Sequence, residues 1–168
     1  YYAIKKIHYL SAIEDVEGDY LEFGVYTGSS FCHSIRCYKK SKELEINADS
    51  KTRFIGFDSF KGFGDLKEED EHSFYTDENF STSLTDVDRR VRRVANNVEY
   101  ELVPGFFEDS LKSGPKTYGI SKAKIIFIDS DTYSSAREAL IFCSSTIQEG
   151  TFIILDCLLY TSPSPRDS

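Results

Sequence analysis

Long apolar runs are absent from this sequence, and so is the residue pattern of a signal peptide. A bilayer-spanning helix needs about 20 consecutive apolar residues, so we expect no contact with a membrane. Cysteine is scarce and forms no CxxC pair and no paired histidine spacing, which argues against a zinc site. Such isolated thiols fit a reducing, cytoplasmic setting in which cysteine packs as a small apolar residue.

Positive charge is also in deficit, because 20 Lys and Arg residues stand against 28 Asp and Glu residues. The formal net charge is −8, whereas a nucleic-acid surface would require a basic stripe. The one basic cluster, residues 89–93, lies late in an expected helix, where it complements the helix dipole. We therefore expect no nucleic-acid partner.

What the chain has is enough apolar sequence for one folded domain. Its 168 residues are 40% hydrophobic and 14% aromatic, which suits a single core over residues 1–156. Because the chain opens on Tyr1 instead of Met, we expect a fragment of a longer protein.

The last twelve residues, 157–168, differ in character, with no periodicity, no helix cap and no following element. Back-translated, they resemble a transposase-type sequencing adapter. We therefore expect the natural sequence to stop at Asp156 and residues 157–168 to be a non-native tail. The alternative is a genuine tail rich in Ser and Pro.

Short apolar segments alternate with helical patterns along residues 1–156. The segments 20–23, 53–57, 99–103, 124–128 and 151–155 are predicted to be buried strands. Apolar periodicity predicts helices over residues 1–17, 30–44, 84–94 and 136–143; Ser29 or Ser30 is expected to cap the second, and Ser134 or Ser135 the last. Apolar strands that alternate with helices indicate an α/β fold, with a parallel sheet covered on both faces.

The segment Glu22-Phe-Gly-Val-Tyr-Thr-Gly28 is the most informative part of the chain. A buried strand ends on a carboxylate, and a turn with two glycines leads into a helix, which is typical of the first unit of a nucleotide- or nucleoside-binding domain. Its glycines are four apart and do not form the GxGxxG of dinucleotide enzymes, so the ligand need not carry phosphate.

Four of the five expected strands end at or beside an acidic residue: Glu22, Asp58, Asp129 and Asp156. Ligands of open parallel sheets bind at the carboxyl ends of the strands, so these carboxylates are expected to converge on one crevice. A carboxylate in the position of Asp58 suits two ribose hydroxyls. Dehydrogenases place that acid about 20 residues after their glycines, whereas Asp58 lies 30 residues after Gly28.

Five blocks, in order, resemble those of the macrocin O-methyltransferase family, whose members are class I S-adenosylmethionine-dependent methyltransferases. They are GDYLEFGVYTG at 18–28, GFDSFKG at 56–62, GFFEDSL at 105–111, IDSDTYSS at 128–135 and GTFIILD at 150–156. The resemblance implies a Rossmann-like class I methyltransferase sheet, truncated before its last two strands. It also implies methyl transfer from S-adenosylmethionine to a hydroxyl of a sugar or natural product.

The resemblance also implies roles for particular residues. The backbone from Gly24 to Gly28 would face the methionine part of the cofactor, Glu22 would brace that turn, Asp58 would hold the ribose, and Phe106 or Phe107 would lie near the adenine. The implied cofactor-binding set is Glu22, Phe23, Gly24, Gly28, Ser29, Asp58, Ser59, Phe106, Phe107 and Asp129.

Family members bind a divalent metal, typically Mg²⁺, and the matching ligands here are Asp129 and Asp156. A second acidic residue usually follows the latter position, where this chain has Cys157, so its own metal affinity stays open. The catalytic residues implied are Asp129 and Asp131, and either one would accept the hydroxyl proton. His72 is a further candidate base; it lies in an aromatic-rich loop over residues 59–81 that is expected to wall the pocket.

Two other functions stay open at this stage. An NAD(P)-dependent oxidoreductase is the enzymatic rival, although the glycine spacing weakens it. An inactive cofactor-binding fragment is the other. Its last strand would leave an exposed sheet edge, which lowers stability and favours association into homo-oligomers.

Overall fold

The computed structural model describes residues 1–47, 50–62 and 81–156. The tail expected at residues 157–168 lies outside this part of the chain, as do residues 63–80 of the expected aromatic loop, with His72. The predictions made for those residues stay predictions.

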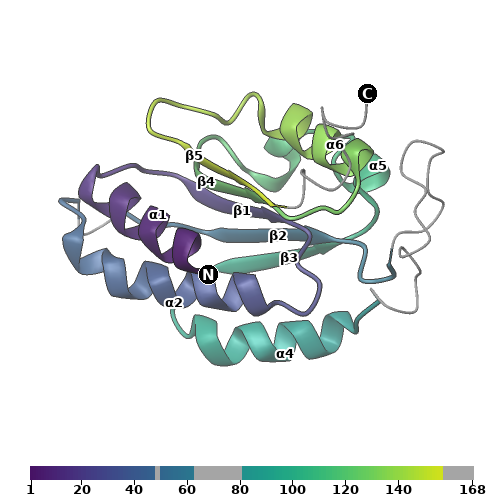
Figure 1. Cartoon of the computed structure of the whole chain (residues 1–168), viewed down its shortest axis with the longest axis horizontal. Helices are drawn as coiled ribbons and strands as arrows, with labels where there is room; N and C mark the ends of the chain where they lie inside the picture. The colour runs from purple at the N-terminus through teal and green to yellow at the C-terminus, as the bar shows by residue number, and fades with distance from the viewer. Residues whose placement is uncertain (48–49, 63–80, 157–168) are drawn as a thin grey trace, which may run out of the picture.

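A five-stranded sheet of order β3-β2-β1-β4-β5 forms the centre of the molecule (Figure 1). Its strands are β1 (Asp19–Phe23), β2 (Phe54–Asp58), β3 (Tyr100–Pro104), β4 (Ala123–Ile128) and β5 (Phe152–Leu155). Every neighbouring pair is parallel, which confirms the parallel α/β sheet expected from the sequence. The strand order reverses between β1 and β4, and ligand crevices open at the carboxyl ends of strands at such a point.

Helices cover both faces of the sheet, as predicted (Figure 1). The helices α1 (Tyr2–Ile13), α2 (Ser29–Ser41) and α4 (Leu84–Ala95) lie on one face, and α5 (Phe107–Ser110) and α6 (Tyr133–Cys143) lie on the other. Two short 3₁₀ helices, η1 (Lys42–Leu44) and η3 (Pro115–Tyr118), complete the described elements. The sequence did not predict α5 or η3, because four residues are too few to show a helical period.

Successive strand residues pack into two separate cores. Tyr20 and Phe54 face α1, α2 and α4, with ring centroids 4.7 Å apart, whereas Phe23 and Phe57 face α6, with centroids 5.0 Å apart. Side chains of a strand alternate between faces, so a sheet covered on both sides needs apolar residues at every position. This requirement explains the continuous apolar runs of the sequence.

The predicted helix caps were wrong. Helix α2 begins after Gly28, which has φ +76°, and no side chain caps it. Helix α6 is capped by Thr132, whose hydroxyl accepts from the N–H of Ser135 at 3.3 Å. In each case the serines lie inside the first turn of the helix, because the strand-to-helix turn ends earlier than the residue types suggested.

Strand β5 lies at an edge of the sheet, where Ile153 is 41% exposed and Leu155 is 46% exposed. The exposed edge expected from the sequence is therefore present in the described residues. Among those residues, none of the helices combines the length and the apolar character needed to cross a membrane.

A buried ion pair at the far end of the sheet gives a first prediction. Lys124 is 1% exposed, and its Nζ lies 2.5 Å from Oε1 of Glu45. Glu45→Ala should lower the free energy of unfolding by about 3–5 kcal/mol, because a buried ammonium loses its counter-charge. Urea unfolding measures this loss. Lys42→Ala is the control, since Lys42 is the more exposed partner of Glu45, and a loss as large there would contradict the prediction.

Candidate functional site

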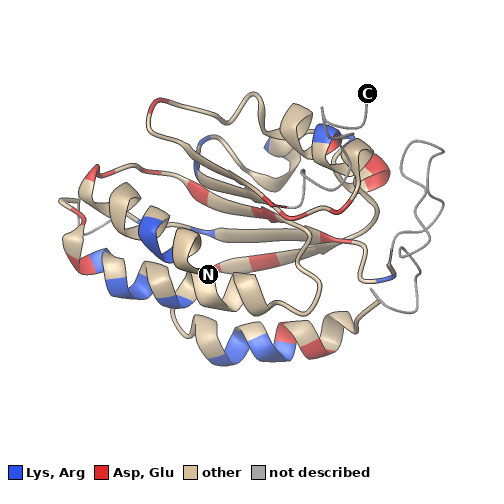
Figure 2. Ribbon diagram, viewed as in Figure 1, with Lys and Arg blue, Asp and Glu red and all other residues tan. Residues whose placement is uncertain are grey.

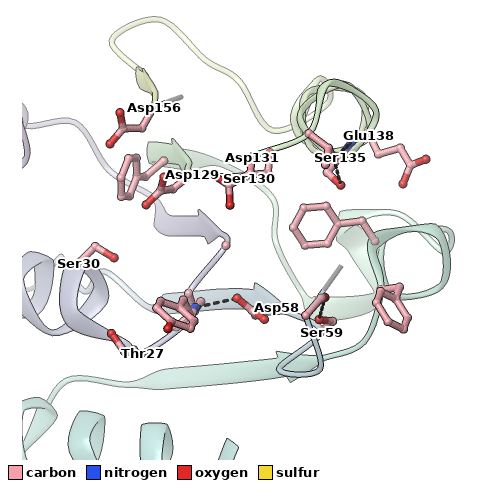
Figure 3. Close-up of a pocket in the computed structure, with 18 of the residues that line it drawn as sticks. Thr27, Ser30, Asp58, Ser59, Asp129, Ser130, Asp131, Ser135, Glu138 and Asp156 are labelled. Atoms are coloured by element: carbon pink, nitrogen blue, oxygen red, sulfur yellow. Dashed lines mark hydrogen bonds between the residues drawn. The ribbon is translucent and has the colours of Figure 1, made fainter. Parts of the chain in front are cut away.

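A pocket of about 740 Å³ opens where the strands end. All five strands contribute to its wall, since residues 24–27 follow β1, Asp58 ends β2, residues 106–109 follow β3, residues 129–132 follow β4, and Asp156 follows β5. The crevice expected at the carboxyl ends of the sheet is therefore present. Figure 3 shows Asp129 and Asp156 on one side of this pocket and Asp58 and Ser59 on another.

The turn between β1 and α2 is wound tightly against the end of β4. Gly24 has φ +90°, and a Cβ on it would lie 2.1 Å from the carbonyl oxygen of Asp129. Tyr26 also has a positive φ, of 47°, which is uncommon outside glycine. Gly24, Ser29 and four further residues of this segment line the pocket: Val25, Tyr26, Thr27 and Ser30.

Two residues of the expected cofactor set lie behind the pocket wall. Gly28 faces α4, because a Cβ on it would lie 3.0 Å from Cγ1 of Val87. Phe23 is fully buried, and its ring packs on Phe57 in the core between the sheet and α6. Neither residue lines the pocket, and the cofactor contact expected of them stays a prediction.

Glu22 does not converge on the crevice with the other three carboxylates. It is fully buried, accepts a hydrogen bond from Tyr20, and accepts another from Oγ of Ser30 at 2.6 Å. Burial raises its pKa to about 8. Ser30 lines the pocket in the first turn of α2, so Glu22 bonds to the pocket wall from behind.

The buried position of Glu22 predicts a pH-dependent stability. Its pKa is about 8 in the folded protein against an ordinary value of 4.5, so folding takes up a proton between these values. The resulting stability is complete below pH 4.5 and is lost as the pH rises through 8. Between about pH 5 and pH 8.5, the wild type should lose roughly 3–5 kcal/mol of unfolding free energy that Glu22→Gln does not lose.

Urea unfolding of both proteins at pH 5 and at pH 8.5 measures how steeply the unfolding free energy of each depends on pH. The exposed acid Glu14 supplies the control, since Glu14→Gln should keep the wild-type pH dependence. An identical slope for Glu22→Gln and wild type would show that Glu22 is charged in the folded protein.

Asp58 ties together the turns that follow β1 and β2. Its Oδ2 accepts from the N–H of Tyr26 at 2.7 Å, and its Oδ1 accepts from the N–H of Phe60 at 2.6 Å. Burial raises its pKa. Each carboxylate oxygen can accept more than one hydrogen bond, so Asp58 keeps the capacity to bind hydroxyls in the pocket. Its neighbour Ser59 also lines the pocket and donates to the carbonyl of Gly62 at 2.6 Å.

Three carboxylates gather where β4 and β5 end. Burial first, and then the nearby charges of Asp156 and Asp131, together raise the pKa of Asp129 to about 6. The pKa of Asp131 is raised by its own burial and then by Asp156. Figure 3 shows the side chains of Asp129 and Asp156 on the same side of the pocket.

This carboxylate cluster bears on the expected Mg²⁺ site. Asp129 and Asp156 offer the hard oxygen donors that Mg²⁺ prefers, and this ion is often held by one or two carboxylates plus water. Within residues 1–47, 50–62 and 81–156, however, no three or more His, Cys, Asp or Glu side chains are arranged to hold a metal. By chemical type alone, Asp129 and Asp156 fit such an ion.

The described pocket wall is strongly acidic. It carries seven carboxylates and, among its described residues, no Lys, Arg or His. The carboxylates are Asp58, Glu108, Asp109, Asp129, Asp131, Glu138 and Asp156. Figure 2 shows basic residues on α2 and α4, on the other face of the sheet from α5 and α6, and a basic residue on α6 itself. A ligand with several phosphate groups would find repulsion at this wall.

Both phenylalanines expected near an adenine line the pocket. Phe106 is 37% exposed, whereas the ring of Phe107 packs edge-to-face on Phe23 with centroids 5.8 Å apart. Phe106 therefore has the more accessible ring, and Phe107 joins the pocket to the core.

A family model supplies the decisive comparison. The model for macrocin-O-methyltransferase (TylF) matches residues 3–165. The chain belongs to this family. A search of curated protein sequences found no match.

Several solved structures share the fold of this member of the macrocin O-methyltransferase family. The O-methyltransferase NovP matches at 22% identity and a TM-score of 0.69, over 92% of this chain and 64% of NovP. The calicheamicin methyltransferase CalS11 matches at 18% identity and a TM-score of 0.66, over 90% of this chain and 62% of CalS11. The SAH-bound Podospora anserina methyltransferase PaMTH1 matches at 13% identity and a TM-score of 0.51, over 90% of this chain and 51% of PaMTH1. The chain thus spans less than two thirds of each of these proteins.

Some lining residues of this family member had no sequence signal. Ile4 of α1 and Tyr1, which precedes that helix, reach the pocket because α1 packs beside α2 over the sheet. Glu138 reaches it from the second turn of α6. Strand ends could be located from apolar patterns, whereas these residues are brought in by helix packing.

Proposed function

We propose that this chain binds S-adenosylmethionine and belongs to an enzyme that transfers the methyl group to a hydroxyl of a sugar or natural product. Family membership supports the reaction class. The observation that carries the proposal is the joint position of Gly24, Asp58 and Asp129 in one pocket, where the strand order reverses.

We assign different residues of the pocket wall to different parts of the cofactor. In this proposal the methionine carboxylate lies by Gly24 and Ser29, since free N–H groups at a helix N-terminus favour an anion. Asp58 accepts from the ribose hydroxyls, with Ser59 beside it, and Phe106 or Phe107 contacts the adenine. Phe23, Gly28 and Glu22 support the turn from behind the wall.

The chain's own residues would align the reactants and take up a proton. The acceptor oxygen attacks the methyl carbon in line, the carbon–sulfur bond breaks, and the sulfonium becomes a neutral thioether. The hydroxyl proton passes to a carboxylate oxygen of Asp131 or Asp129. Asp129 and Asp156 would hold Mg²⁺, whose chemistry is to lower the pKa of a bound hydroxyl.

The acidic wall favours this cofactor over NAD(P). S-Adenosylmethionine has no phosphate and carries a positive sulfonium, so the seven carboxylates attract it. NAD(P) has a charged pyrophosphate, for which the described wall offers no basic side chain.

We also propose a cytoplasmic location, no nucleic-acid partner, and association into homo-oligomers through β5. The buried free thiols of Cys32, Cys37 and Cys143 support the first of these. The exposed edge residues Ile153 and Leu155 support association.

Isothermal titration of the chain with S-adenosylhomocysteine and, separately, with NAD⁺ tests the proposal. Binding of the first and not the second is expected. Binding of NAD⁺ alone, or of neither ligand, would overturn the proposed function. Methyl transfer by the longer parent protein, against a panel of hydroxylated sugars and natural products, separates an active enzyme from an inactive cofactor-binding fragment.

A further inference from the structure

Helix α4 contacts the turn between β1 and α2 from outside the pocket. Arg90 of α4 donates from Nη1 to the carbonyl oxygen of Thr27, which lies 63 residues earlier in the sequence, at 2.5 Å. One helical turn earlier, Val87 packs against Gly28 so closely that a Cβ there would lie 3.0 Å from its Cγ1. The helix therefore touches two successive residues of the turn.

A second route joins the turn to the start of α4. Tyr26 donates its N–H to Asp58, and Asp58 also accepts from the N–H of Phe60. The carbonyl of Phe60 accepts from the N–H of Thr82 at 3.2 Å, and Ser83 then caps α4. The Arg90 contact thus closes a ring of contacts that runs from Tyr26 through α4 and back to Thr27.

The turn needs such support because its backbone is strained. Gly24, Tyr26 and Gly28 all have positive φ, and Tyr26 is not a glycine. A non-glycine residue held in this region costs of order 1–3 kcal/mol and persists only where surrounding contacts hold it. A guanidinium that holds the next carbonyl restricts the rotation by which the turn would relax.

We infer that Arg90 is a positioning residue of the cofactor site, acting through the carbonyl of Thr27. Its guanidinium holds the turn in the shape that lines the pocket, although Arg90 itself lies outside the pocket wall. The inference rests on the proposed function, in which this turn receives the methionine part of the cofactor.

Arg90→Met tests the inference, because it keeps the apolar stem and removes the donors. The dissociation constant for S-adenosylhomocysteine should rise about fivefold, because the lost hydrogen bond is exposed and acts on the ligand only through the turn. Amide hydrogen exchange at residues 24–28 should become faster, with an unchanged melting temperature, since Arg90 is exposed. Arg90→Lys should recover part of the affinity, because an ammonium can still donate to Thr27.

Arg93→Met is the matched control, since it removes the same charge from the same helix one turn further on. It should leave affinity and exchange unchanged. Equal affinity and equal exchange in Arg90→Met and wild type would overturn the inference, as would an equal loss in Arg93→Met. If the wild-type chain binds no S-adenosylhomocysteine, the proposed function fails, and exchange at residues 24–28 still decides the role of Arg90.

Discussion

Gly24→Ala should abolish binding of S-adenosylhomocysteine. The new Cβ would lie 2.1 Å from the carbonyl oxygen of Asp129 and 2.8 Å from its carbonyl carbon, so backbone meets backbone. Neither side can rotate away, because Gly24 donates to the carbonyl of Phe57 and Asp129 donates to the carbonyl of Phe23. The ends of β1 and β4 must separate, which opens the pocket between them.

Titration calorimetry measures the loss, and thermal unfolding shows whether the domain persists. Unfolding free energy should fall by about 3 kcal/mol or more, since the strained φ of +90° adds to the clash. Gly114→Ala is the matched control. Its φ is +75°, but no atom lies within 4 Å of the new Cβ, so it carries the backbone strain without the clash. Wild-type affinity in Gly24→Ala would contradict the close contact with Asp129.

Asp58→Ala should weaken binding of S-adenosylhomocysteine by about 100-fold, since hydrogen bonds to charged groups contribute about 1.5–3 kcal/mol. The substitution removes the proposed acceptor of the ribose hydroxyls. It also leaves the N–H groups of Tyr26 and Phe60 without the carboxylate that now accepts from them. Ligand contact and turn geometry are lost together, which places the effect near the upper end of that range.

Two further variants divide this effect into its parts. Asp58→Asn keeps one carbonyl oxygen and should retain more of the affinity than Asp58→Ala, because a neutral acceptor remains. Asp109→Ala removes a different carboxylate from the same pocket wall and should change the affinity less than threefold, as a screened charge would. Equal losses in Asp58→Ala and Asp109→Ala would mean that general charge, and not the position of Asp58, governs binding.

The expected effects of Gly24 and Asp58 share one physical cause. Both residues hold the turn after β1 against a neighbouring strand, Gly24 against β4 and Asp58 against β2. Arg90 holds the same turn against α4. A site that is organised before its ligand arrives loses less conformational entropy on binding.

The strands and the position of the pocket could be predicted from the sequence. Strands buried on both faces are rich in apolar residues, so 20–23 and 124–128 were evident as short apolar segments, each with one charged residue. Parallel strands bring their carboxyl ends to one edge, so Asp58, Asp129 and Asp156 were expected to meet, and they do.

The orientation of individual side chains could not be predicted in the same way. Glu22 and Phe23 are adjacent to the turn in sequence, yet both are buried beneath the pocket wall. Gly28 matched a ligand-binding pattern, yet its missing side chain makes room for Val87 of α4. A residue pattern gives the local turn, whereas the partner across the turn is set by a helix more than 50 residues away.

The parallel sheet, the succession of strands and helices along the chain and the edge at which a ligand would bind follow from local hydrophobic pattern and chain direction. Which carboxylates reach that edge, and which one is buried, depends on the folded arrangement. It alone brought Tyr1, Glu138 and the guanidinium of Arg90 to the site or its support. Those placements depend on how helices pack over the sheet, and packing joins residues that no sequence spacing relates.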